Sequence, residues 1–203
     1  MSYEIFIDIE TLGIRETAYP LSIALVAFDF NQKPIFADLE QDKEKQLFIK
    51  FSLEDLSNYK AFTKDPSTVE WWKKQPEKAK KLNLIPHKND VTLTKGLHLI
   101  HKFFEEFYTM NSSHVWSRGI DFDLPKFKYM HDVGGRSYPF NPRRGRDCRT
   151  FIDVLCETDN GFYESPIMYP PEEHGLIKHF PLHDALYDIY SMLEIVHGEG
   201  TPF

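Results

Sequence analysis

The sequence lacks any apolar run approaching the roughly 18 residues that a membrane-spanning helix needs. Its first residues also lack the basic region and apolar core of a secretory signal. We therefore expect a cytoplasmic protein with no membrane partner. Cysteine is scarce as well, with only Cys148 and Cys156, which excludes a disulfide framework and a cysteine-rich zinc site.

Basic residues are outnumbered, since 24 Lys and Arg face 31 Asp and Glu, giving a net charge of −7. An acidic chain is poorly suited to bind nucleic acid over a wide surface. Divalent ions bound by some of the acids would offset this charge, and an enzyme with a small footprint needs only a local basic patch. The charge balance alone therefore leaves a nucleic-acid enzyme possible.

The chain is long enough to bury a core, with 203 residues, 41% hydrophobic and 27% charged. It contains no internal repeat and no low-complexity segment. We expect one domain over 1–203, with a helical insertion at about 52–90 and a long ordered loop at about 158–181, where prolines and aromatics follow no clear period.

Strand patterns dominate the N-terminal quarter of the chain, and helical patterns dominate the rest. Residues 3–11, 21–30 and 35–51 (strongest over 46–51) are expected as an antiparallel meander, and 114–119 as a short strand. Helices are expected over 92–109, 122–132, 149–157 and from about Asp184 to Gly198, with a basic loop over 134–146. The pattern predicts an α/β protein with a mixed sheet flanked by helices.

Two acids end the first expected strand. Alternation in a strand places Asp8 and Glu10 on one face with Phe6, about 7 Å apart at the backbone. Two carboxylates beside apolar residues are costly unless something compensates them, and a divalent metal is the usual partner. The alternative is two ordinary polar residues where a strand reaches the surface.

A third acid, Asp123, begins the helix that follows the short strand. This position lies beside the carboxyl end of the sheet, where open α/β folds keep their sites. An acid in a first helical turn is also stabilised by the helix dipole without any ligand. The choice between Asp121 and Asp123 stays open at this point.

The last helix supplies His183 and Asp188. Residues five apart on a regular helix differ by about 140°, so these two cannot share a face. If Asp184 caps the helix, His183 lies in the preceding loop and Asp188 in the first full turn. A rigid acid beside a mobile imidazole suits the activation of water.

In this order and at these separations, Asp8-x-Glu10-Thr11, Phe122-Asp123 and His183-x4-Asp188 resemble the three motifs of the DEDDh 3′–5′ exonucleases, which have a ribonuclease-H-like fold. Intervening segments narrow the resemblance to the exonuclease A (DexA) group of large tailed phages, with the ribonuclease AS group more distant. These segments are 62–64, 67–72, 118–119 and 146–150. Many members of the wider family have asparagine where Arg118 stands.

The resemblance implies that Asp8, Glu10, Asp123 and Asp188 bind two Mg²⁺ or Mn²⁺ ions and that His183 is the general base. Asp121 and Asp184 are extra acids beside the motif positions, and we interpret them as neighbours rather than ligands. Thr11 and Leu12 are expected to contact the terminal sugar and base, and Phe122 to add a stacking surface. Trp71 and Trp72 cannot both face the core, because neighbours on a helix point about 100° apart, so Trp71 is a further candidate for substrate contact.

The expected activity is hydrolysis of single-stranded DNA from its 3′ end, releasing nucleoside monophosphates, in the host cytoplasm if the protein is a phage's. The same chemistry on RNA is the alternative, and a non-catalytic nucleic-acid-binding module is a remote third. Arg143, Arg144 and Arg146 form a phosphate patch or a solvated loop, and Lys126 is expected at the surface. A homodimer is possible, because some members of the resembled family complete their site in that way.

Overall fold

The computed structural model describes residues 3–198, so residues 1–2 and 199–203 of the expected domain lie outside the described part. A five-stranded mixed sheet lies at its centre, in the order β3-β2-β1-β4-β5. The strands are β1 (Glu4–Thr11), β2 (Pro20–Phe28), β3 (Gln46–Lys50), β4 (Val115–Ser117) and β5 (Gly145–Asp147). The first three are antiparallel neighbours, as the meander predicts, whereas β4 and β5 run parallel to β1.

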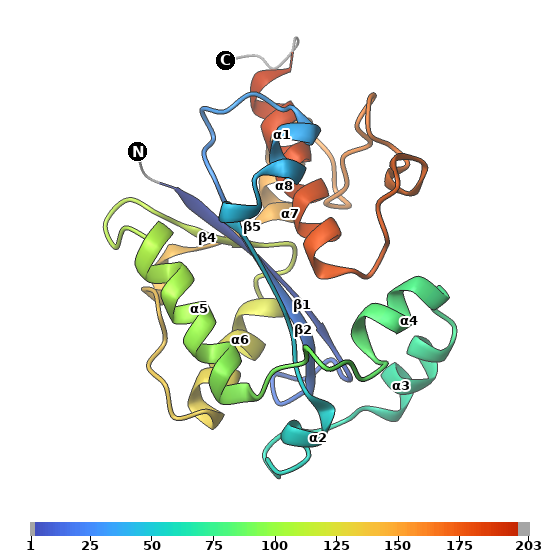
Figure 1. Cartoon of the computed structure of the whole chain (residues 1–203). Coiled ribbons are helices and arrows are strands. Elements are labelled where there is room, and N and C mark those ends of the chain that lie inside the picture. Colours follow the sequence, from blue (N-terminus) through green and yellow to red (C-terminus); the bar gives the residue numbers. More distant parts are fainter. Residues whose placement is uncertain (1–2, 199–203) are drawn as a thin grey trace.

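Helices cover both faces of the sheet (Figure 1). One face packs on α5 (Leu93–Phe107) and α6 (Asp123–Val133). The other packs on α8 (Pro181–His197), with α7 (Cys148–Cys156) and α1 (Phe36–Gln41) beside it. None of the helices in the described residues 3–198 is both long and apolar enough to cross a membrane.

The alternation of β1 divides its side chains between the two cores as the sequence predicts. Ile5, Ile7 and Ile9 belong to the core beneath α5 and α6. Phe6 belongs to the opposite core, beneath α8. Asp8 and Glu10 share the face of Phe6, so both carboxylates point toward α8 at the end of a strand that is paired on both sides.

The expected helical insertion is three short helices, α2 (Leu53–Leu56), α3 (Pro66–Lys73) and α4 (Glu77–Asn83). Asp65 caps α3 by accepting a hydrogen bond from the Ser67 N–H. Trp72 is buried at 1% exposure and donates its indole N–H to the Thr11 carbonyl at 2.9 Å. The insertion is therefore tied to the end of β1, where the two acids lie.

The structure contradicts two sequence predictions, one of a strand and one of a loop. Residues 35–45 form α1 and a 3₁₀ turn over Lys43–Lys45 rather than strand, because Phe36 and Leu39, three residues apart, face the same core, as they do on a helix. The basic loop contains a 3₁₀ turn, Pro142–Arg144, and the edge strand β5, whose pairing with β4 its sequence does not reveal.

The last helix begins earlier than expected. Phe180 is its N-cap and Pro181 its first residue, a position that proline favours because it needs no backbone N–H there. Asp184 therefore lies inside the first turn instead of capping it. The preceding long loop includes a 3₁₀ turn over Pro171–His174. Both His183 and Asp188 are consequently on regular helix, where they face different ways.

Candidate active site

Five carboxyl groups from three elements gather at the end of β1. Burial and four neighbouring carboxylates raise the pKa of Asp8 well above its ordinary value. Burial, then Asp184 and Asp123, do the same to the pKa of Glu10. We call Asp8, Glu10, Asp123, Asp184 and Asp188 the acid cluster; it contains all four acids that the sequence assigned as metal ligands.

Asp123 is the first residue of α6 and is only 4% exposed. Its Oδ1 accepts a hydrogen bond from the Ile9 N–H at 3.3 Å, which holds it against β1. Burial raises its pKa to about 7, although this hydrogen bond and the nearby Lys126 oppose the shift. Asp123 therefore lies in the acid cluster, whereas Asp121 is exposed.

Asp184 lies one helical turn before Asp188, on the same face of α8. Burial and the charge of Asp188 raise the pKa of Asp184 to about 7. Its carboxyl group also raises the pKa values of Asp8 and Glu10. The sequence reading of Asp184 as a mere neighbour is therefore incomplete, because its charge belongs to the acid cluster.

Arg118 offsets part of this negative charge. Its guanidinium donates a charge-assisted hydrogen bond to Asp188 and a second hydrogen bond, of 2.9 Å, to the Gly161 carbonyl. It also lies over the ring of Phe162, 4.5 Å from the ring centroid. Burial raises the pKa of Asp188, and Arg118 opposes that rise.

His183 lies apart from the acid cluster. Its Nδ1 accepts a hydrogen bond of 2.9 Å from the Ile177 N–H, and its ring packs edge-on against Phe180. Burial lowers the pKa of His183, and the charged groups that also affect this pKa are Glu40 and Lys43, neither of which belongs to the acid cluster. The structure therefore does not bring the predicted base together with the predicted ligands.

His179, rather than His183, is the histidine that lies beside the acid cluster. Its Nδ1 is 3.8 Å from Glu10 Oε1, and its ring packs edge-on against Trp71. Sequence reasoning gave His179 no role. A signal was present, because His179 and Asp184 repeat the spacing of His183 and Asp188.

A pocket of about 450 Å³ adjoins the acid cluster. It is lined by Glu10, Thr11, Gly13, Ile14, Ser67, Thr68, Trp71 and Phe122. Trp71 and Phe122 are 41% and 38% exposed, so two aromatic surfaces are available to a ligand. Leu12 is buried at 7% exposure and does not line the pocket, so its predicted contact with the terminal base requires the loop to open.

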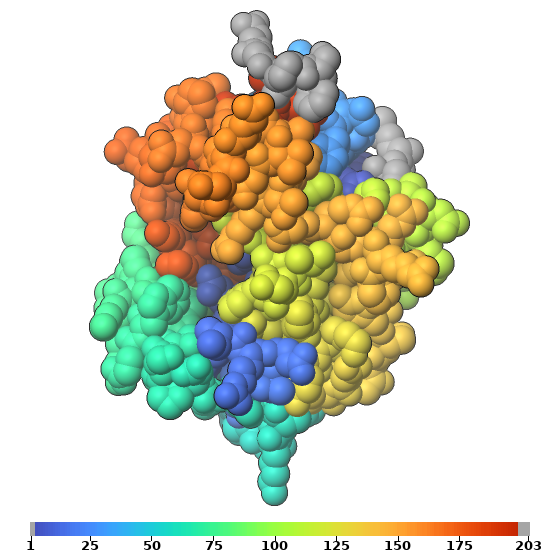
Figure 2. All heavy atoms as spheres, turned by 180° about the vertical axis from the view of Figure 1, so that it is seen from behind, coloured from blue at the N-terminus to red at the C-terminus, as the bar shows by residue number. Residues whose placement is uncertain are grey.

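Figure 2 shows the N-terminal segment, in blue, at the meeting point of the teal insertion, the yellow-green region of α6 and the red-orange segment before α8. These are the segments that supply the acid cluster and the pocket. Residues far apart in the sequence thus converge on one face of the molecule.

Lys126 is buried at 2% exposure, so its expected place at the surface is wrong. Its ammonium group donates to the Ile14 and Phe122 carbonyls and lies over the Phe122 ring. Burial lowers its pKa to about 8, although the nearby Asp123 favours the charged form. Lys126 thereby holds together two walls of the pocket.

The predicted basic patch is largely occupied by contacts within the protein. Arg144 donates to the Asn111 carbonyl and to His114 Nε2. Arg146 donates to the Gly145 and Arg143 carbonyls. None of the three arginines of this loop lines the pocket beside the acid cluster.

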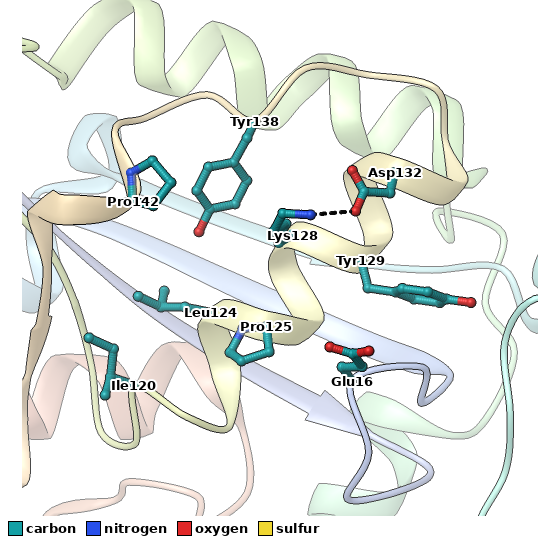
Figure 3. A pocket seen from close by; sticks show the side chains of 9 residues that line it. All are labelled: Glu16, Ile120, Leu124, Pro125, Lys128, Tyr129, Asp132, Tyr138 and Pro142. Carbon is teal, nitrogen blue, oxygen red and sulfur yellow. Dashed lines mark hydrogen bonds and ion pairs between the residues drawn. The ribbon is translucent and has the colours of Figure 1, made fainter.

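A second pocket, of about 370 Å³, lies on the outer side of α6 (Figure 3). Its ionisable residues include Glu16 and the ion pair of Lys128 with Asp132, 2.7 Å apart. The wall therefore carries a net negative charge, which disfavours a phosphate. It contains no member of the acid cluster.

The family model described as the 3′-5′ exoribonuclease Rv2179c-like domain matches residues 3–196. The exodeoxyribonuclease of Enterobacteria phage T4 is 35% identical, over 94% of this chain and 87% of the relative. The model match covers nearly the whole chain, including every member of the acid cluster.

Two solved structures share the fold at low sequence identity. The nuclease domain of 3′hExo, a DEDDh family member bound to rAMP, matches with a TM-score of 0.60 at 10% identity, over 97% of this chain and 93% of that one. A zinc-bound E. coli exonuclease I in complex with single-stranded DNA matches with a TM-score of 0.54 at 15% identity, over 96% of this chain. This chain spans 40% of the length of exonuclease I. The fold is thus the ribonuclease-H-like fold of DEDDh exonucleases, and the chain belongs to the Rv2179c-like family of 3′–5′ exonucleases.

Proposed function

We propose that the protein removes nucleotides from the 3′ end of single-stranded DNA, with two divalent ions held by Asp8, Glu10, Asp123 and Asp188. The observation that carries the proposal is the acid cluster. Buried and half-buried carboxylates with raised pKa values form a site that binds cations favourably, since a cation removes their mutual repulsion. Oxygen donors without sulfur suit Mg²⁺ or Mn²⁺.

Bound there, such ions would acidify a water molecule and offset the charge on the leaving oxygen. The chain itself contributes orientation. Asp123 is fixed by the Ile9 N–H, and Asp188 by Arg118, so these ligands are ordered before substrate arrives. Arg118 lies beside Asp188, where a cation held by Asp188 would leave the guanidinium free to donate to a phosphate oxygen.

His183 remains the proposed proton acceptor on the basis of its motif. Its Nδ1 is engaged by the Ile177 N–H, so the ring must turn away from that contact to receive a proton at the acid cluster. Burial lowers its pKa, which keeps the imidazole unprotonated at neutral pH and so free to accept a proton, while making it a weaker base. The unprotonated state therefore fits the role, whereas the orientation of the ring has to change.

The pocket beside the acid cluster is the proposed site of the terminal nucleotide. Trp71 and Phe122 offer faces for a base, and stacking on aromatic rings tolerates every base. Thr11 donates its hydroxyl to the Gly13 carbonyl at 2.7 Å, so it shapes the loop as well as lining the pocket.

Trp71→Ala is expected to raise KM for single-stranded DNA about tenfold and to change kcat less, because one stacked base is worth roughly 1–3 kcal/mol. Steady-state kinetics on a labelled oligonucleotide measures both constants. Val154→Ala is a matched control, since Val154 is also an exposed apolar residue, lies on α7 and does not line the pocket. An unchanged KM in Trp71→Ala would remove Trp71 from the substrate site.

DNA is proposed as the substrate because the relative that is 35% identical is an exodeoxyribonuclease, although the family model is described as an exoribonuclease. The experiment is degradation of matched, 3′-labelled DNA and RNA oligonucleotides of one sequence, with Mg²⁺. We expect a kcat/KM for DNA at least about tenfold higher. Faster release from RNA would reverse the substrate assignment, and no release from either would refute the exonuclease proposal.

A further inference from the structure

Two members of the acid cluster, Glu10 and Asp184, lie close to His179, and the three residues come from three segments of the chain. One atom each from Glu10, His179 and Asp184 lies within 4.8 Å of the others. Ligand atoms of one tetrahedral Zn²⁺ lie roughly 3.3–3.6 Å apart, so side-chain movements of about an ångström would close this set around a cation. All three residues are partly exposed, so an ion has access.

His179 is held in this position from several directions. The backbone N–H of His179 donates a hydrogen bond to Asp184 Oδ2 at 2.9 Å. Its backbone carbonyl accepts one from the buried Asn83 side chain at 2.6 Å. Its φ of 63° lies in the left-handed region, which costs a residue other than glycine energy to adopt. Trp71 packs against the ring, with the centroids 4.8 Å apart.

Asn83 shows how this conformation is maintained. It is the last residue of α4, is fully buried, and also bonds to the Ser22 hydroxyl and the Ala79 carbonyl. Ser22 is the partner of Glu10 in the β1–β2 ladder. The same connected set of hydrogen bonds therefore fixes the backbone of His179 and reaches the strand that carries Glu10.

We propose that Glu10, His179 and Asp184 form a further cation site, which overlaps the acid cluster and takes a transition-metal ion, with Zn²⁺ as the best fit. This inference rests on the proposed function, because Glu10 is also a proposed ligand of the catalytic ions. Two oxygens and an imidazole nitrogen suit Zn²⁺, whereas Mg²⁺ prefers oxygen ligands alone. Zn²⁺ bound there takes Glu10 from the catalytic ions and inhibits Mg²⁺-dependent turnover.

The test is calorimetric titration of the full chain with Zn²⁺ and, separately, with Mg²⁺. His179→Gln and Asp184→Asn are each expected to weaken Zn²⁺ binding at least about tenfold. His183→Gln is the matched control, because its ring faces Ile177, and it is expected to bind Zn²⁺ like the wild type. Equal Zn²⁺ binding by His179→Gln and the wild type, or an equal loss in His183→Gln, would overturn the site.

Inhibition by Zn²⁺ separates this inference from the proposed function. Each variant is compared with its own rate in Mg²⁺, and His179→Gln is expected to need about tenfold more Zn²⁺ for half-inhibition. A wild-type protein that binds Zn²⁺ through His179 but has no Mg²⁺-dependent turnover would refute the exonuclease and support the site. Loss of turnover in His179→Gln with unchanged Zn²⁺ binding would make His179 the proton acceptor and overturn the site.

Discussion

Asp123→Asn is expected to slow nucleotide release at least about 10³-fold and to raise the melting temperature of the metal-free protein. The amide keeps the size of the side chain and can still accept from the Ile9 N–H, but it cannot supply negative charge to a cation. At pH 8 the substitution removes one ionised carboxylate from the acid cluster. We expect a gain of roughly 5–10 °C.

Asp121→Asn is the control for this variant. Asp121 lies two residues away and is exposed, so its substitution is expected to change neither rate nor melting temperature appreciably. Rates from oligonucleotide degradation and melting curves in EDTA provide the two measurements. An Asp123→Asn protein with more than a tenth of the wild-type rate would contradict the proposed ligand set.

Metal-free protein is expected to lose stability as the pH rises from 6.5 to 8. In the folded state the pKa values of Asp123 and Asp184 are about 7, and those of Asp8 and Glu10 are also raised. Unfolded carboxyl groups titrate near pH 4, so in this window only the folded state releases protons and ΔG of unfolding falls. A loss on the order of 2–4 kcal/mol lowers the melting temperature by roughly 5–15 °C.

Other groups do not produce this change in the same window. Burial lowers the pKa of His131 to about 4, so its contribution to stability rises with pH from about 4 to 7 and opposes the loss slightly instead of causing it. The pKa of Lys126, lowered to about 8, adds stability only at higher pH. Melting curves in EDTA and in saturating Mn²⁺ measure the effect. A metal-free protein with a flat profile would show that the acid cluster is not under mutual repulsion.

The parts of the fold set by local periodicity could be predicted. The strand β1, the buried strand β2 and the amphipathic α5 are long enough for alternation or helical spacing to show in the sequence. The edge strand β5 could not be predicted, because its three residues have no alternation and its hydrogen bonds come from β4. The helical pattern of apolar residues is also weak in α1, because only one of its six residues, Leu39, is buried.

The site residues likewise divide into those that the sequence predicts and those that it does not. Asp8, Glu10, Asp123 and Asp188 follow from motifs whose spacing is read along the chain. His179 was missed although its spacing to Asp184 repeats that of His183 to Asp188, because its place depends on the buried Asn83, 96 residues away, and on a left-handed backbone. Lys126 was missed for a related reason, since nothing in its sequence context shows that Ile14 covers it.

The two adjacent tryptophans allow ligand binding to be followed by intrinsic fluorescence. Trp72 is sealed within the protein, while Trp71 is partly open to solvent beside the pocket. With Trp116, which lies in the other core, they make up all the indole fluorescence of the chain. Occupation of the pocket should therefore quench mainly one emitter, so arrival of an oligonucleotide can be followed without attaching a dye.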